Sequence, residues 1–258
     1  MTGRDGTLSK VPAVTLGFWL IKILATTLGE TGGDTVTMTM NWGYLAGSTL
    51  FVGLLVVLIG LQIAAQRFHP LLYWTAIVAS TTAGTTMADF ADRSLGIGYA
   101  GGSSLLLAAV LLVLGLWYAS ERTISVETVN TPRVELFYWA AITLSQTLGT
   151  ALGDWMADDT GLGYLGAAAV FGAALLVVAG AFFWTGLSRA LLFWAAFILT
   201  RPLGATVGDF LDKPHADGGL ALSRPAASLV IAALLILGIL LLPQRPGVHP
   251  GQAGKAAG

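Results

Sequence analysis

The chain contains 258 residues, of which 55% are hydrophobic and 10% are charged. Soluble globular domains carry roughly 25% charged residues, so this composition indicates a protein that crosses a membrane several times. A net charge of −1 offers no basic surface to nucleic acid, and the absence of cysteine excludes disulfides and thiolate metal sites. The expected partners are membrane lipid and a small inorganic ion, and the sequence predicts no particular oligomeric state.

Eight apolar segments follow one another along the chain. Each is long enough to cross about 30 Å of hydrocarbon, which takes about 20 helical residues. Polar loops separate them, and the longest, Ser120 to Pro132, falls between the fourth and the fifth. The sequence therefore predicts an all-α membrane protein with eight transmembrane helices, at residues 12–35, 44–66, 71–91, 98–119, 134–157, 163–185, 188–211 and 221–243.

The motif Trp-x9-Gly-x4-Asp occurs four times, once in each odd-numbered segment. An aromatic residue precedes every Trp, and a small residue precedes every Asp. Each repeat contributes two spans, so the four motif helices run in the same direction and their Asp residues reach one level. We expect four two-helix hairpins; around an axis along the membrane normal they would bring these carboxylates together, but the sequence does not distinguish such a ring from two separate pairs. The motif residues are Trp19, Gly29 and Asp34; Trp74, Gly84 and Asp89; Trp139, Gly149 and Asp154; Trp194, Gly204 and Asp209.

The spacing between motifs divides the chain into two halves. Successive Trp residues are 55, 65 and 55 residues apart, so the additional length falls in the middle. Residues 1–119 are expected to hold the first two repeats and residues 134–243 the other two. Residues 120–133 form the linker between the halves, and residues 244–258 a flexible cytoplasmic tail.

The distribution of positive charge predicts the orientation. The termini and the loops between hairpins hold eight Lys and Arg residues, whereas the loops within hairpins and the start of the last helix hold three. By the positive-inside rule both termini are cytoplasmic, in the inner membrane of the cell. The repeated Trp residues are then expected to be anchors at the inner interface, with the Asp ends of the motif helices toward the outside.

Two polar layers follow on the motif helices. The first lies seven and eight residues after each Trp and, with Lys22, predicts a polar substrate pathway. The second lies nearer the outside and consists of carboxylates, an expensive group within a bilayer. The pathway residues are Lys22, Thr26, Thr27, Thr81, Thr82, Gln146, Thr147 and Arg201; the predicted metal ligands are Glu30, Asp34, Asp89, Asp154 and Asp209; the expected solvated mouth is Asp92, Asp158 and Asp212.

The glycine of each motif lies between these two layers. Such glycines permit either close helix approach or local unwinding that frees carbonyl oxygens. The five predicted ligands carry five negative charges, and Lys22 and Arg201 carry two positive charges. Three negative charges therefore remain uncompensated. Oxygen ligands without cysteine favour hard cations such as Mn²⁺, Mg²⁺ or Ca²⁺, and neighbouring buried carboxylates favour coupling to protons. The sequence thus predicts a proton-coupled transporter of a divalent cation, with no permanently bound cofactor and no enzymatic activity.

Two other classes of function stay open. Lys22 and Arg201 would suit a carrier or sensor of an anion or small ligand. Asp154 and Asp209 would suit an intramembrane aspartyl hydrolase, because Gly-Asp ends both motifs, although Ala151 and Thr206 replace the first glycine of that signature.

The segment KILATTLGETGGD, from Lys22 to Asp34, and its later copies STTAGTTMAD, SQTLGTALGD and TRPLGATVGD resemble a bacterial family of uncharacterised membrane-anchored proteins. The resemblance covers most of the chain and implies a multi-pass membrane protein without implying an activity. Residues 29–35, GETGGDT, are also similar to the Glu-x-Gly-Asp signature of small cation/proton exchangers. Here one additional residue separates Glu30 from Asp34, and only the first repeat carries the Glu.

Overall fold

The computed structural model describes residues 8–248, which form eight long helices and one short sheet. The prediction of an all-α protein with eight helices is confirmed, and helix ends differ from the predicted bounds by at most four residues. The helices are α1 Leu16–Asp34, α2 Tyr44–Ala64, α3 Pro70–Asp89, α4 Tyr99–Glu121, α5 Pro132–Asp154, α6 Gly163–Trp184, α7 Arg189–Asp212 and α8 Arg224–Leu241; the strands are β1 Leu8–Pro12 and β2 Pro246–Val248.

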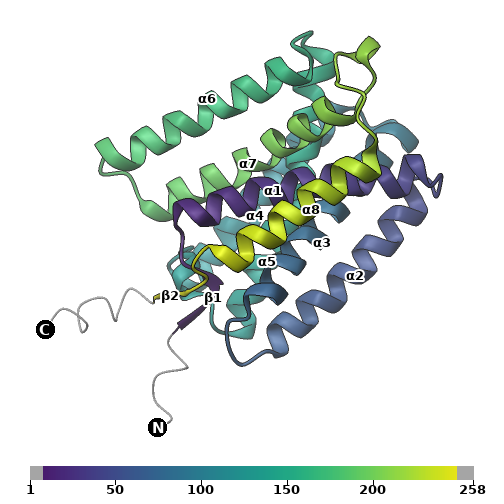
Figure 1. Cartoon of the computed structure of the whole chain (residues 1–258). Helices are drawn as coiled ribbons and strands as arrows, with labels where there is room; N and C mark the ends of the chain where they lie inside the picture. The colour runs from purple at the N-terminus through teal and green to yellow at the C-terminus, as the bar shows by residue number, and fades with distance from the viewer. Residues whose placement is uncertain (1–7, 249–258) are drawn as a thin grey trace, which may run out of the picture.

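The four motif helices form a closed ring. Helix α1 packs against α3, α3 against α5, α5 against α7, and α7 against α1. Equivalent positions of neighbouring motifs meet, so the four helices are parallel, as their common place in the repeat predicts. Figure 1 shows these helices at the centre of the molecule, with the others around them.

Each outer helix packs against the motif helix of the next repeat. Helix α2 covers α3, α4 covers α5, α6 covers α7, and α8 returns to cover α1 (Figure 1). The expectation that a repeat packs as a two-helix hairpin is therefore not met. After three of the motif helices the chain makes a π-helical turn, at Thr35–Thr39, Phe90–Ser94 and Trp155–Asp159, before it enters the outer helix. These connections carry the chain from one motif helix to the outside of its neighbour.

The motif glycines are places of close helix contact. A Cβ atom on Gly29 would lie 2.0 Å from the Oγ1 atom of Thr81, and one on Gly84 would lie 2.9 Å from the backbone carbon of Gln146. Gly149 meets Arg201 and Gly204 meets Thr26 in the same way. The α-helices continue without interruption through all four glycines. Of the two roles considered for these glycines, the structure shows close packing rather than unwinding.

The repeated Trp residues lie in the protein interior. The aromatic residue before each Trp contacts the Trp of the next repeat, with ring centroids 5.4 Å apart for Phe18 and Trp74 and 5.6 Å for Phe193 and Trp19. Trp74, Trp139 and Trp194 are at most 2% exposed. The prediction that the repeated Trp residues anchor the protein at the lipid interface is wrong for these three. They close one end of the ring because each fills the space between two motif helices.

Five helices, α2, α4, α6, α7 and α8, are long and apolar enough to cross a membrane. In the four outer helices of this group only 11–22% of the apolar window is buried within the protein, against 61% in α7. Large apolar side chains such as Leu111, Val177 and Leu237 point outward from them. An exposed apolar surface of this extent identifies a membrane protein.

The ends of the described chain meet beside the aromatic end of the ring. Strand β1 pairs antiparallel with β2, with Leu8 opposite Val248. The linker of the two halves contributes a short 3₁₀ turn, Val126–Thr128, which packs against β1. The predicted flexible tail at 244–258 thus includes an ordered strand at Pro246–Val248, and residues 249–258 lie outside the described residues.

Candidate functional site

The axis of the ring is occupied at mid-height by Arg201. Its side chain is fully buried, and both terminal nitrogens donate to Oε2 of Glu30 at 3.0 Å. The Nη2 atom also donates to the hydroxyls of Thr85 at 2.6 Å and Thr150 at 2.5 Å. Arg201 on α7 therefore contacts all three other motif helices. Glu30, predicted as a metal ligand, is instead the counter-ion of this arginine.

Lys22 lies about one helical turn deeper along the axis, and Gln146 lies at the level of Arg201 in its repeat. Both side chains are 0% exposed. The ammonium of Lys22 lies 4.0 Å from the ring centroid of Phe197 and has no hydrogen-bond partner among the described residues. Both amide atoms of Gln146 and the Nε atom of Arg201 also lack a partner there.

The remaining residues of the predicted pathway support the helices. Thr27, Thr82 and Thr147 donate to backbone carbonyls one turn earlier in their own helices, at 2.8–3.1 Å. Thr26 and Thr81 occupy helix contacts, where they fill the space beside Gly204 and Gly29. These hydroxyls are satisfied by the backbone and help the ring to pack.

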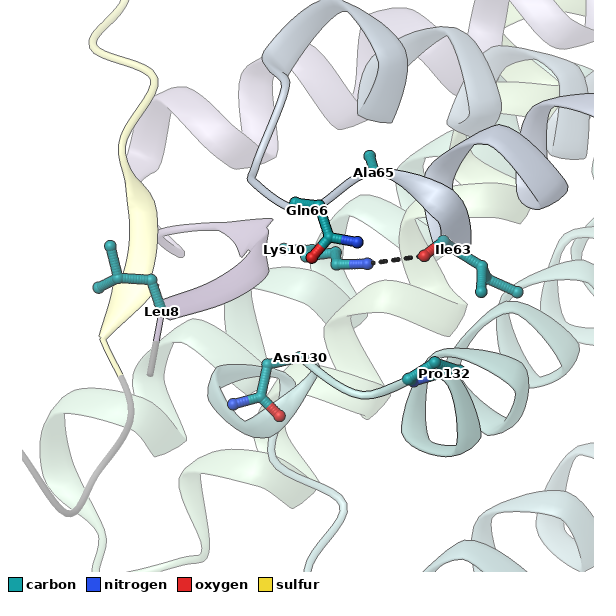
Figure 2. A pocket seen from close by; sticks show the side chains of 7 residues that line it. All are labelled: Leu8, Lys10, Ile63, Ala65, Gln66, Asn130 and Pro132. Carbon is teal, nitrogen blue, oxygen red and sulfur yellow. Dashed lines mark hydrogen bonds between the residues drawn. The ribbon is translucent and has the colours of Figure 1, made fainter. Parts of the chain in front are cut away.

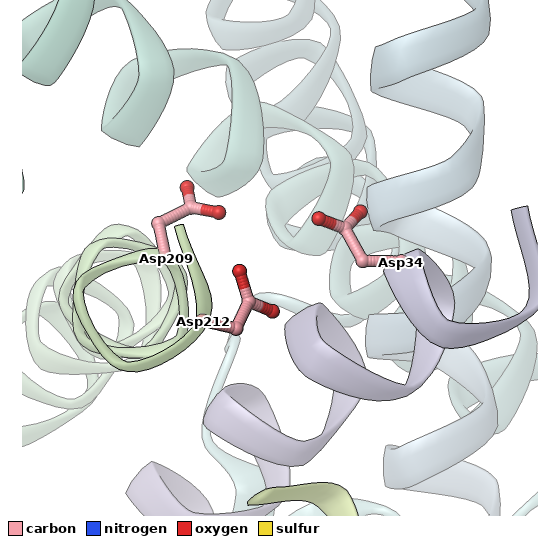
Figure 3. Close-up of side chains that lie close together, drawn as sticks. All are labelled: Asp34, Asp209 and Asp212. Carbon is pink, nitrogen blue, oxygen red and sulfur yellow. The ribbon is translucent and has the colours of Figure 1, made fainter. Parts of the chain in front are cut away.

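Three buried carboxylates converge at the outer end of the ring. One oxygen each from Asp34, Asp209 and Asp212 lies within 4.8 Å of the others. Figure 3 shows Asp34 on α1 facing Asp209 and Asp212 on α7, with the three carboxylates directed into a common space. The three side chains are 1–6% exposed. Four of their six oxygens, one on Asp34, one on Asp209 and both on Asp212, accept no hydrogen bond from the described residues.

Two basic side chains adjoin this three-carboxylate cluster. The Nζ atom of Lys213 lies 3.0 Å from Oδ2 of Asp34 and 3.1 Å from Oδ1 of Asp209. Arg224 lies farther away, with Nε 3.7 Å from Asp34 and 3.5 Å from Asp212. Burial disfavours the charged form of Lys213, but the carboxylates of Asp209 and Asp34 outweigh it and raise the pKa of this lysine above its ordinary value. Its ammonium is therefore charged at physiological pH.

The other predicted ligands lie on the far side of the ring. Asp89 pairs with Arg93, four residues later, at 2.9 Å. Asp154 is 4% exposed and has no ion-pair partner within the described part of the chain. Asp154 and Asp209, the pair considered for a hydrolase, make no hydrogen bond to each other in residues 8–248, and Lys213 engages Asp209.

The expected mouth residues differ from one another. Asp158 is exposed and Asp92 is partly buried, in keeping with a mouth. Asp212 is only 6% exposed, so its prediction as a solvated residue is wrong. The reason is local: α7 continues to Asp212, whereas the other motif helices change to a π-helical turn directly after the motif Asp. The side chain of Asp212 consequently remains on the inner side of the helix, three residues after Asp209.

Sequence reasoning missed three basic residues that pair with motif carboxylates, Arg93, Lys213 and Arg224, and the first two share a sequence signal. Repeats two and four share the pattern Asp-Phe-x-Asp-Arg/Lys, at residues 89–93 and 209–213, which the other two repeats lack. An acid followed by a base four residues later is a helical ion pair. This pattern was sufficient to predict both Arg93 and Lys213 as partners.

A shallow pocket lies at the opposite end of the molecule, beside the strands. Figure 2 shows Lys10 among its lining residues, with Nζ donating to the carbonyl of Ile63 at 3.1 Å. Lys10 also forms a 2.6 Å ion pair with the buried Glu135. These contacts join β1 to α2 and α5, so Lys10 has a structural role at this end of the molecule.

The fold and these layers define a class: a membrane protein in which four repeats surround a polar axis. The family described as Repeat of Unknown Function (DUF347) matches residues 17–68, 72–123, 137–188 and 192–245, and the chain belongs to that family. Each match covers one motif helix and the outer helix that follows it. No curated protein and no solved structure matches the chain, and the local similarity to cation/proton exchangers has no counterpart in these comparisons.

Proposed function

We propose that this protein is a multi-pass membrane carrier of a hard divalent cation, bound by Asp34, Asp209 and Asp212. The main support for this proposal is the convergence of three buried carboxylates from two helices, with ligand oxygens within 4.8 Å of one another. Oxygens around Ca²⁺ lie at 2.3–2.6 Å from the ion, so oxygens on opposite sides of it are about 5 Å apart. A single ion fits that separation.

The charge at the outer end supports a divalent ion. Six buried carboxylates lie in the half of the ring that contains the three-carboxylate cluster: Glu30, Asp34, Asp89, Asp154, Asp209 and Asp212. Four cations compensate them: Arg93, Arg201, Lys213 and Arg224. Two negative charges remain, in place of the three expected from the sequence, because Asp212 joins the acids, three cations were not anticipated, and Lys22, which lies deeper on the axis, is not counted at this end. One divalent cation, or two protons, neutralises this excess, which favours exchange of the cation against protons.

The ammonium of Lys213 occupies the position of a cation between Asp34 and Asp209. A bound metal ion replaces it there, and the loop after α7 moves with the lysine. The axis below the cluster is closed by the Arg201–Glu30 ion pair and by the aromatic end of the ring. Transport then proceeds by alternate opening of the two ends, as in carriers, and not through a continuous pore.

All eight helices cross the membrane in this proposal. Helices α1, α3 and α5 are not among the five helices that are apolar enough by length and composition alone, but they lie in one closed ring with α7, which is. The excess of positive charge at the termini and between repeats orients the aromatic end toward the cytoplasm of the inner membrane. The three-carboxylate cluster then opens to the outside.

Thermal unfolding of the purified protein tests the proposed site. Mn²⁺, Ca²⁺ or Mg²⁺ at about 100 times its Kd stabilises a protein by about 2.7 kcal/mol, which raises the melting temperature of a chain of this size by roughly 5 °C. We expect this rise in the native protein and its loss in Asp34→Asn and Asp212→Asn. Asp158→Asn, which changes an exposed carboxylate at the same end, keeps it. Equal rises in all four proteins would exclude the cluster as the site.

Uptake of radioactive Mn²⁺ or Ca²⁺ into proteoliposomes tests the transport step. We expect uptake driven by a pH gradient in the native protein and in Asp158→Asn, and none in Asp212→Asn. Binding without uptake under any gradient would show a receptor or sensor and would refute the carrier.

A further inference from the structure

The middle of the axis contains buried donors without acceptors. Lys22, Gln146 and Arg201 project from α1, α5 and α7, and all three side chains are 0% exposed. The Nζ atom of Lys22, the Nε2 atom of Gln146 and the Nε atom of Arg201 have no hydrogen-bond partner in residues 8–248. Buried polar groups in native proteins almost always have a partner, so three such donors near one axis indicate a bound species.

The three residues lie within about one helical turn of one another along the motif helices. The ammonium of Lys22 lies over the ring of Phe197, and Arg201 follows Phe197 by four residues on the same helix. Gln146 occupies the same position of its repeat as Arg201, seven residues after the motif Trp. A rise of 1.5 Å per residue places these levels about 6 Å apart.

Lys22 has no carboxylate to balance its charge. Glu30 is engaged by Arg201 at 3.0 Å. Asp34 is twelve residues farther along α1, which is about 18 Å along the helix axis. The ring of Phe197 supports a cation through its π face but does not neutralise it. Arg201, on the adjacent helix α7, carries a charge of the same sign. A charged lysine buried beside it is stabilised by an anion close by.

We propose that Lys22, Gln146 and Arg201 bind a small monovalent inorganic anion of the chloride type on the axis of the ring. The donors supply an ammonium, an amide N–H and a guanidinium N–H, which suit a spherical acceptor without directional demands. A small anion is proposed because Ile77 and Ile142, which share the position of Lys22 in their repeats, are fully buried and leave little space at this level. This site differs in charge, depth and residues from the three-carboxylate cluster. The anion site and the cation carrier are therefore independent proposals, and refuting one does not refute the other.

Halide-dependent thermal unfolding in a gluconate buffer tests the proposal. Chloride and bromide should raise the melting temperature of the native protein in a saturable manner. Lys22→Met should abolish the rise, and Gln146→Leu should weaken halide binding about tenfold. Lys10→Met is the matched control, because Lys10 is also a buried lysine but pairs with Glu135; it should keep the full halide response. A native protein that ignores halides, or a Lys22→Met protein with an unchanged response, would overturn the site.

Crystals of the native protein grown in bromide provide a second test that needs no variant. An anomalous peak is expected within hydrogen-bond distance of the Lys22 ammonium. Absence of bromide there, in crystals that bind bromide elsewhere, would show that water or an uncharged amine satisfies the site and would refute the anion.

Discussion

Lys213 and Arg93 occupy the same place in their repeats, four residues after the motif Asp. Each forms an ion pair with that Asp, but Lys213 also reaches Asp34 from the neighbouring repeat. Arg93 therefore neutralises one carboxylate, whereas Lys213 holds two together. Under the proposed function, this difference makes Lys213 the residue that competes with a metal ion at the three-carboxylate cluster.

Replacement of Lys213 should tighten cation binding. In Lys213→Met the carboxylates of Asp34 and Asp209 lose the ammonium between them, so the metal-free protein becomes less stable by about 3 kcal/mol. The same loss removes the competitor, and we expect the Kd for Mn²⁺ or Ca²⁺, measured by isothermal titration, to fall by about tenfold. Arg93→Met is the matched change outside the cluster and should leave that Kd unaltered. A higher Kd in Lys213→Met would mean that the lysine does not compete with the metal ion.

Gly204 illustrates what the motif glycines do. A Cβ atom there would lie 2.1 Å from the hydroxyl and 2.5 Å from the Cβ atom of Thr26, which is fixed in the facing helix. Gly204→Ala should force α1 and α7 apart and lower the free energy of unfolding by about 1–3 kcal/mol. Gly115→Ala is the control, because a Cβ atom at Gly115 on α4 has no neighbour within 4 Å. Denaturation of both variants in the same detergent would show the difference, and equal stability would contradict the role in packing.

At the level of helices, the sequence predicted number, length and direction well, since long apolar runs and the fourfold motif report them directly. It did not predict that outer helices cover the next repeat. Three of the four connections that produce this arrangement are π-helical turns, after Asp34, Asp89 and Asp154, and the fourth is the loop after Asp212; no residue pattern specifies either kind of connection. The candidate site was predicted only in part for the same reason. Asp34 and Asp209 were expected together, whereas Asp212 depends on the unbroken end of α7.

The contact of α1 with α7 also depends on the ion pair between Glu30 and Arg201. Both partners are buried, so the loss of one leaves an uncompensated charge, which costs about 3–5 kcal/mol. Glu30→Gln and Arg201→Met should each destabilise the protein by this amount. The double variant should be more stable than either single variant, as a double-mutant cycle of unfolding free energies would reveal. Additive losses would mean that the two residues act separately.

The whole molecule is a ring closed by its own ends. Helix α8 completes the cover of α1, and β2 pairs with β1, so the last repeat joins the first as each repeat joins the next. In such an arrangement the packing of the helices does not depend on which two repeats the N- and C-termini separate. Under the proposed topology each repeat crosses the membrane twice, so every new terminus must lie on the side that already carries termini.

Circular permutation tests this view of the ring. A chain that begins at Thr123, continues through Gly258 into Met1 and ends at Arg122 keeps all eight helices and opens the ring after α4. The paired positions of Leu8 and Val248 allow residues 249–258 and 1–7 to connect the old ends. We expect this permutant to accumulate in the membrane with a melting temperature close to that of the native chain. A chain opened between Trp42 and Gly43 places its ends on the other side and should accumulate poorly, because its first helix must insert against the distribution of positive charge. Equal accumulation of both permutants would refute the proposed orientation, and failure of the first alone would show that the order of repeats matters for assembly.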